Sequence, residues 1–165
     1  MKTERLNNLN GEITEWTAVS SSPDRTLSMG EAFGLLLPAG STVSFQGGLG
    51  SGKTCFVKGV CSGLGIRSEV LSPSFILVEE YKGDLNVLHF DLYRLDELGD
   101  VYETGLFDAA DGRNIILVEW GDRLPDGTFD FDIIVEIEIM GEKLRDFRFM
   151  GPENFINCLK EAAGG

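Results

Sequence analysis

One stretch of the chain strongly restricts its fold: Gly47-Gly48-Leu49-Gly50-Ser51-Gly52-Lys53-Thr54. It matches the pattern G-x-x-x-x-G-K-[ST], in which glycines allow backbone N–H groups to turn inward around phosphate oxygens. Residues 42–45 before it are typical of a β-strand, and residues 55–61 after it predict a helix whose positive dipole end points at the loop. This context favours a phosphate-binding loop over a glycine-rich turn that happens to precede a lysine.

A loop of this type assigns a role to each of its polar residues. Lys53 is expected to reach the β- and γ-phosphates of a nucleotide as a fixed positive charge, and Thr54 to give its hydroxyl to Mg²⁺. The residues expected to contact the nucleotide here are Gly48, Leu49, Gly50, Ser51, Gly52, Lys53, Thr54 and Cys55.

The pattern along the rest of the chain predicts an α/β fold. Ser22 is a plausible N-cap with Pro23 at the first helical position, so a helix is expected after a strand at residues 13–19. Further strands are expected at residues 75–81, 87–93, 114–119, 131–139 and 144–150, and helical segments at residues 96–110 and 152–163. Helices between strands indicate a mainly parallel sheet, here with antiparallel strands added at one side. We expect a single P-loop NTPase-like domain over residues 1–165.

Composition narrows the classes of partner. Hydrophobic residues make up 42% of the 165 residues and the formal net charge is −13. A chain this acidic lacks the broad basic surface that affinity for nucleic acid requires, so any action on RNA is expected to pass through a partner. No apolar run approaches the roughly 18 residues of a membrane span, and the N-terminus lacks the apolar core of a signal peptide. The expected location is the cytoplasm, away from membranes.

Hydrolysis of a nucleotide also needs acids beside the phosphate loop. Asp91 ends the run Asn86-Val87-Leu88-His89-Phe90, and Glu119 ends the apolar run Asn114-Ile115-Ile116-Leu117-Val118. Ligands of open α/β sheets collect at the carboxyl ends of strands, so both acids are expected near the loop. They are candidates for holding Mg²⁺ and orienting water.

Four motifs in order make the chain resemble a known family. They are the loop at residues 47–54, Ser72-Pro73-Ser74-Phe75, His89-Phe90-Asp91-Leu92-Tyr93-Arg94-Leu95 and Val118-Glu119-Trp120. Together they resemble the bacterial TsaE family, also called YjeE, over roughly residues 12 to 150. The resemblance implies a small Mg-dependent ATPase required for the threonylcarbamoyl modification of adenosine beside the anticodon in ANN-decoding tRNAs. It also implies binding to a TsaB–TsaD heterodimer, in which TsaD carries the transfer chemistry.

The same resemblance implies roles for particular residues. Lys53, Asp91 and Glu119 are the expected catalytic residues, and Thr54, Asp91 and Glu119 the expected Mg²⁺ residues, with the direct ligand among the two acids left open. Ser74 lies in the family's switch segment, where Thr is usual, and Trp120 resembles the aromatic residue beside the site. Gly48 stands where the family usually has Asp.

Other interpretations remain at this stage. A GTP-operated switch protein needs an N-K-x-D element, and the chain contains no Asn-Lys pair. A small-molecule kinase usually needs an Arg-rich lid, whereas the stretch between Asp91 and Asn114 holds only Arg94 and Arg113. His89 is the one histidine; a structural or partner-contacting role is favoured over that of a catalytic base.

Overall fold

The computed structural model describes residues 11–71, 78–95 and 98–164. Its elements are, in chain order, β1 (Ile13–Ser20), α1 (Pro23–Leu36), β2 (Thr42–Gln46), α2 (Lys53–Gly63), β3 (Val78–Tyr81), β4 (Val87–Asp91), α3 (Leu98–Glu103), α4 (Leu106–Ala109), β5 (Ile115–Glu119), the 3₁₀ helix η2 (Gly121–Arg123), β6 (Ile133–Ile139), β7 (Arg145–Pro152) and α5 (Glu153–Ala163).

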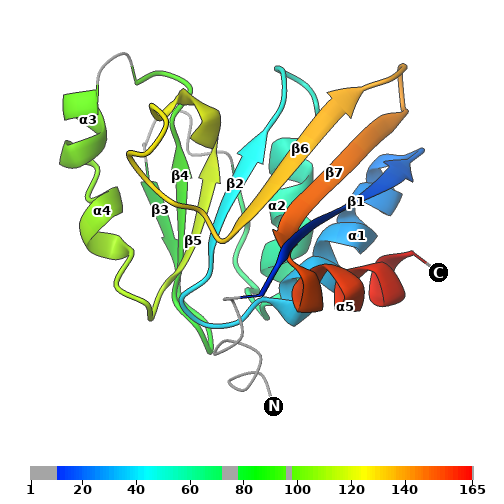
Figure 1. Ribbon diagram of the computed structural model, residues 1–165, viewed down its shortest axis with the longest axis horizontal. Coiled ribbons are helices and arrows are strands. Elements are labelled where there is room, and N and C mark those ends of the chain that lie inside the picture. The colour runs from blue at the N-terminus through cyan, green and yellow to red at the C-terminus, as the bar shows by residue number, and fades with distance from the viewer. Residues whose placement is uncertain (1–10, 72–77, 96–97, 165) are drawn as a thin grey trace.

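The strands form one seven-stranded sheet in the order β1-β7-β6-β2-β5-β4-β3. Neighbouring strands from β6 to β4 run parallel, whereas β7 and β1 at one edge and β3 at the other are antiparallel to their neighbours. Figure 1 shows α3 and α4 beside β3 and β4 at one end of the sheet, and α1 and α5 beside β7 and β1 at the other.

The predicted mainly parallel sheet with flanking helices is confirmed. One detail differs, because antiparallel strands lie at both edges rather than at one side. Strand β3 pairs antiparallel with β4, the last strand of the parallel group. At the other edge β1, near the start of the chain, pairs antiparallel with β7, near its end. The predicted segment that includes Ser74 lies outside the described residues.

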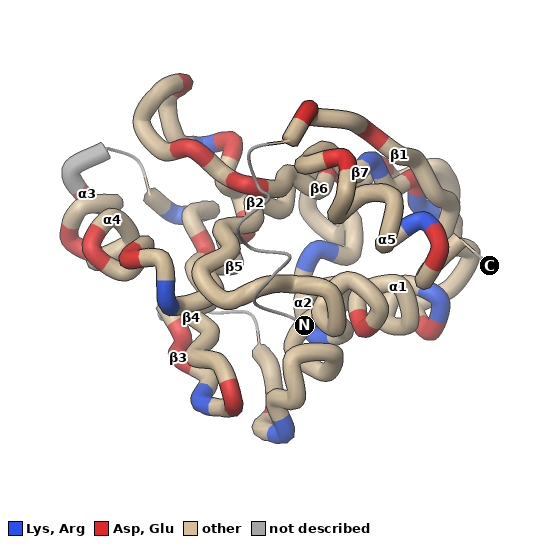
Figure 2. The backbone as a smooth tube through the Cα atoms, turned by 60° about the horizontal axis from the view of Figure 1, so that its bottom comes forward, with Lys and Arg blue, Asp and Glu red and all other residues tan. Residues whose placement is uncertain are grey.

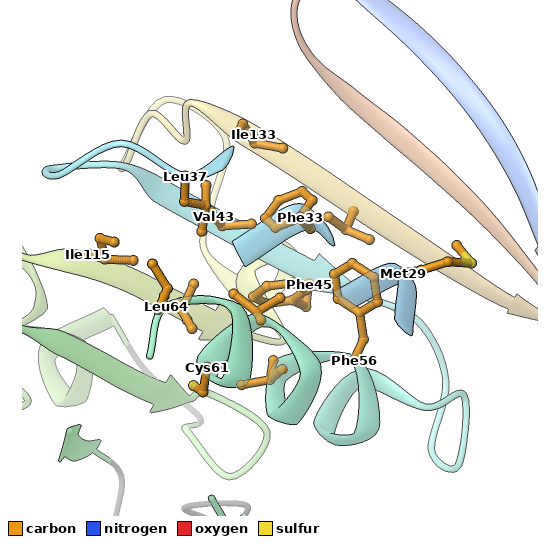
Figure 3. Packing of buried hydrophobic residues seen from close by; sticks show 14 of the residues in the cluster. Met29, Phe33, Leu37, Val43, Phe45, Phe56, Cys61, Leu64, Ile115 and Ile133 are labelled. Carbon is orange, nitrogen blue, oxygen red and sulfur yellow. The ribbon is translucent and has the colours of Figure 1, made fainter. Parts of the chain in front are cut away.

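Two hydrophobic cores lie on opposite faces of the sheet. On the face covered by α1, α2 and α5, the core includes Phe33, Phe45 and Phe56, and Figure 3 shows these rings between helix and sheet. The other core joins β4 and β5 to α3 and α4. Ile115 and Leu117 belong to the first core and Ile116 and Val118 to the second. This burial on both faces explains the continuous apolar run of β5.

Ser22 caps α1 as predicted, since its side chain accepts a hydrogen bond from the Arg25 backbone N–H.

Helices α1 and α2 pack with their backbones in close approach. A Cβ atom built on Gly34 would lie 2.1 Å from the Val60 carbonyl oxygen, and one on Gly59 would lie 2.3 Å from the Leu27 carbonyl oxygen. Because Gly34 and Gly59 have no side chain, the two helix backbones can approach this closely, and these glycines therefore set the distance between α1 and α2.

Charged residues are spread over the surface rather than sorted by element. Figure 2 shows acidic segments around much of the chain and basic segments scattered among them. Within the described ranges, no helix combines the length and apolar character needed to cross a membrane.

The close approach predicts the effect of a single methyl group. Gly34→Ala should lower the free energy of unfolding by roughly 1–3 kcal/mol, because overpacking against backbone outweighs the helix propensity that alanine gains. Gly141→Ala is the matched control, since its Cβ would meet only Leu144 Cβ at 3.6 Å. Urea denaturation of both variants measures the difference. Equal stability of Gly34→Ala and the wild type would contradict the proposed limit on helix spacing.

Candidate functional site

The phosphate loop, which is the glycine loop of residues 47–52 that the sequence predicts to bind phosphate, lies between the end of β2 and the start of α2. Gly47, Gly50 and Gly52 have φ angles of 148°, 73° and 103°, in the left-handed range that favours glycine. Gly52 is the N-cap of α2 and makes no side-chain capping hydrogen bond. The helix therefore presents its N-terminal N–H groups, and the positive end of its dipole, without a capping side chain. This geometry suits an anion.

Lys53 is the first residue of α2, and its side chain is only 5% exposed. Its ammonium donates hydrogen bonds to the carbonyl oxygens of Gly47 (2.6 Å) and Gly48 (2.8 Å), and to Ser51 Oγ (3.3 Å). Burial lowers the pKa of Lys53, while the nearby carboxylates, Glu119 first among them, act to raise it. The loop thus holds a cation in a partly desolvated position at its centre.

The two predicted acids end adjacent parallel strands. Asp91 of β4 and Glu119 of β5 are register partners, with exposures of 6% and 2%. Thr54 Oγ1 donates a 2.8 Å hydrogen bond to Glu119 Oε1, which joins the first turn of α2 to the end of β5. Asp91 Oδ1 accepts a hydrogen bond from the Tyr93 backbone N–H at 2.9 Å. The carboxyl ends of β4 and β5 therefore lie beside the phosphate loop, as the sequence predicts.

His89 contacts the second oxygen of the same carboxylate. Its Nε2 lies 2.6 Å from Glu119 Oε2, and the imidazole is fully buried on β4. Among the described residues, its Nδ1 has no hydrogen-bond partner. The sequence favours a structural or partner-contacting histidine and does not connect it with Glu119. The one local signal is the alternation that places His89 and Asp91 on the same face of the strand.

Aromatic rings form the opposite wall of the site. Lys53 Nζ lies 4.0 Å from the ring centroid of Trp120, whose ring packs against Tyr93 at 4.9 Å between centroids. The Arg123 guanidinium lies 5.0 Å from the Tyr93 ring centroid. Trp120 has a φ angle of 62°, which is unusual for a bulky residue. Its backbone N–H donates a hydrogen bond to the Phe45 carbonyl oxygen. Trp120 is the N-cap of η2 and connects this 3₁₀ helix to Glu119 at the end of β5.

These side chains enclose a cavity of 280 Å³. The structure brings most of the predicted site residues to its wall, together with Tyr93, which the prediction did not include. The lining is Leu49, Gly50, Ser51, Gly52, Lys53, Thr54, Cys55, Asp91, Tyr93, Glu119 and Trp120. Gly48 takes part through its carbonyl oxygen, and Ser74 lies outside the described residues.

The donor atoms at the cavity are those that Mg²⁺ prefers. Thr54, Asp91 and Glu119 offer a hydroxyl and two carboxylates on one side of the loop. Within the described ranges, no group of three or more His, Cys, Asp or Glu side chains is arranged to hold a metal ion. Mg²⁺ usually binds through one or two carboxylates plus phosphate oxygens and water, so the residues present fit it without such a group.

Arg145 supports the loop from β7 and was missed by sequence reasoning. Its Nε donates to the Ser51 carbonyl oxygen at 3.1 Å and its Nη2 to the Gly50 carbonyl oxygen at 3.2 Å. A further donation reaches the Gly141 carbonyl oxygen at 2.8 Å. No motif marks this arginine, because its partners in the loop, Gly50 and Ser51, lie more than ninety residues away.

Removing this support should loosen the nucleotide-free loop. In Arg145→Met, amide hydrogen exchange at residues 47–52 should quicken by roughly five- to tenfold, since hydrogen bonds from a charged donor are worth about 1.5–3 kcal/mol before solvent screening. Arg148→Met is the control on the same strand, because Arg148 pairs with Glu15 and Glu136 instead. Unchanged exchange at the loop in Arg145→Met would show that the guanidinium does not restrain it.

A glycine loop between a central parallel strand and a helix, with a buried lysine facing two strand-end carboxylates, defines a protein of the P-loop α/β class. Comparison with known proteins narrows the class. The family model described as "Threonylcarbamoyl adenosine biosynthesis protein TsaE" matches residues 20–147. The chain therefore belongs to the TsaE family.

Individual relatives agree with this assignment. The tRNA threonylcarbamoyladenosine biosynthesis protein TsaE of Treponema pallidum is 38% identical over 128 residues, which cover 78% of this chain and 95% of that protein. The protein of the same name from Bacillus subtilis is 30% identical, with coverages of 89% and 91%. The crystal structure of Bacillus subtilis YdiB matches with a TM-score of 0.67 and 25% identity, covering 93% of this chain and 96% of that one.

Proposed function

We propose that this chain is a Mg²⁺-dependent ATPase that supports formation of threonylcarbamoyladenosine in tRNA together with a TsaB–TsaD complex. Membership of the TsaE family supports the pathway, and the names of the relatives refer to the same biosynthesis. The site supports the ATPase activity, and the acidic charge of the chain supports action through a partner.

One observation carries the proposal of hydrolysis. Among the described residues, the buried side chains of the Lys, His, Asp and Glu types are Lys53, His89, Asp91 and Glu119. Lys53, Asp91 and Glu119 line the cavity at the phosphate loop, and His89 contacts Glu119. Burying ionisable groups is costly unless they are paired, so a fold that gathers them at one cavity supports a functional site there. A cation beside two carboxylates on a glycine loop suits a metal-bound polyphosphate.

One group of residues would bind the nucleotide, and a second group would bind the metal ion. The N–H groups at the start of α2 and the Lys53 ammonium would bind the phosphate oxygens and stabilise the charge that develops on the transferred phosphoryl group. Thr54, Asp91 and Glu119 would hold Mg²⁺, which when bound neutralises phosphate charge and aligns the phosphates. One of the two acids would also orient the attacking water. Trp120 and Tyr93 line the opposite wall.

Action on tRNA would pass through the partner. The net charge is −13, with 14 basic against 27 acidic residues, and Figure 2 shows basic segments scattered among acidic ones. Phosphate contacts from Lys and Arg supply most non-specific affinity for RNA. A surface with this excess of acidic residues would offer few such contacts. We therefore place the contact with tRNA on the TsaB–TsaD side, and the work of this chain in the cytoplasm.

Replacement of the loop lysine tests the ATPase directly. Lys53→Ala should lower kcat for ATP hydrolysis by roughly 10²-fold or more, because a preorganised charge at the transferred phosphoryl group is worth about 3 kcal/mol. Lys160→Ala is the control, since its side chain is exposed on α5. A phosphate-release assay with folding checked by circular dichroism measures both. Near-normal turnover in folded Lys53→Ala would overturn the ATPase assignment.

Association with the partner should depend on the bound nucleotide. We expect ATP with Mg²⁺ to tighten binding to TsaB–TsaD by roughly 5- to 150-fold relative to ADP, the usual range of coupling between two sites. Calorimetric titration of the wild-type protein against TsaB–TsaD measures it in three states: with Mg²⁺ and a non-hydrolysable ATP analogue, with Mg²⁺ and ADP, and without nucleotide. A parallel titration with tRNA alone should show negligible affinity at physiological salt. Equal partner affinities in all three states would remove the nucleotide switch.

A further inference from the structure

His89 is buried beside the site but does not form the wall of its cavity. Its side chain is fully buried, and the 280 Å³ cavity is lined by Asp91 and Glu119 but not by His89. Its neighbours are the Tyr81 ring, 6.2 Å away between centroids, and the Glu119 carboxylate at 2.6 Å. An imidazole in this position cannot touch phosphate directly, so any effect on the reaction must act through Glu119.

The hydrogen bond has a defined direction. An ionised carboxylate only accepts hydrogen bonds, so Nε2 of His89 must carry the hydrogen. Nδ1 has no partner among the described residues. A hydrogen there would be a buried donor without an acceptor, which disfavours the Nδ1–H tautomer. The contacts therefore select an imidazole that donates from Nε2 to Glu119 Oε2.

Two donors then fix the Glu119 carboxylate. Thr54 Oγ1 donates to Oε1 from the first turn of α2, and His89 donates to Oε2 from β4. Thr54 is itself one of the residues expected to hold Mg²⁺, so its hydrogen bond to Glu119 can be exchanged when a metal ion enters. The bond from His89 lies on the other oxygen and can persist through that exchange.

We propose that His89 is a positioning residue that holds the Glu119 carboxylate in the orientation required at the Mg²⁺ site. The inference rests on the proposed ATPase function for its kinetic consequences. Hydrogen-bond partners of metal-binding side chains commonly fix ligand orientation, and their loss weakens metal affinity or activity. Among the described residues, the buried imidazole makes one hydrogen bond, to Glu119, and leaves Nδ1 unmatched. An apolar side chain would avoid that cost, so the presence of a histidine here fits this role.

Nuclear magnetic resonance of the nucleotide-free protein tests the bond itself. The chain contains a single histidine, so imidazole nitrogen signals from protein labelled with ¹⁵N-histidine belong to His89 alone. We expect a protonated Nε2 whose proton exchanges slowly with water and moves upfield in Glu119→Gln. A neutral Nδ1–H tautomer, or an Nε2–H signal unchanged in Glu119→Gln, would overturn the inference.

Matched variants test the consequence. His89→Gln places an amide donor near the position of Nε2, whereas His89→Asn places it near Nδ1 and out of reach of Glu119. We expect His89→Leu and His89→Asn to lower kcat and Mg²⁺ affinity by roughly 10- to 100-fold, with KM for ATP within about threefold of the wild type. His89→Gln should restore most of the loss. Mg²⁺ affinity is measured by titration in the presence of ADP, which requires no turnover.

The outcomes separate this inference from the proposed function. Wild-type protein that does not hydrolyse ATP overturns the ATPase assignment, while the imidazole spectrum still decides whether His89 holds Glu119. An active wild type with equal kcat and Mg²⁺ affinity in His89→Gln, His89→Asn and His89→Leu overturns the positioning role. If His89→Leu does not fold, the comparison of His89→Gln with His89→Asn decides the matter, because both keep a polar amide in the buried site.

Discussion

The hydrogen bond from Thr54 to Glu119 is the contact on which the geometry of the site depends. It joins the first turn of α2 to the end of β5, so the uncapped helix terminus and the strand-end carboxylates face one cavity. The contact is possible because β2 and β5 are parallel neighbours with Phe45 opposite Glu119. The loop that leaves β2 therefore begins where β5 ends. A shift of register by one residue would turn Glu119 to the other face of the sheet.

Packing on both sides of the sheet maintains this register. Ile115 and Leu117 lie in the core beneath α1 and α2, while Ile116 and Val118 lie in the core with α3 and α4. Sliding β5 by one residue would exchange the side chains that enter the two cores and disrupt the packing of both. The close approach of α1 and α2 at Gly34 and Gly59 then sets how deeply α2 lies on the sheet. The position of Lys53 at its first turn follows from that packing.

The sequence was sufficient for what local patterns encode. The glycine loop, the Ser22 cap and the apolar run at residues 115–118 each predict their element, and the acids at the strand ends predict which edge carries the site. Long-range partners were beyond it. The attachment of Arg145 to the loop and the pairing of β1 with β7 join distant segments, and no local pattern specifies such pairs. The left-handed conformation of Trp120 also has no signal, since glycine would be the expected residue there.

The net negative charge of the chain would repel a polyphosphate, and the positive groups at the site would offset this repulsion locally. The overall field of a protein with a net charge of −13 repels an anion, but that repulsion is screened beyond about 8 Å at physiological ionic strength. Inside the cavity the nearest groups are the Lys53 ammonium and the N–H groups of α2, in a partly desolvated setting where each charge acts strongly. The buried carboxylates would oppose a bare nucleotide while favouring one that carries a divalent cation. The two buried acids, Asp91 and Glu119, would thus make the site selective for a metal-bound nucleotide over free phosphate anions.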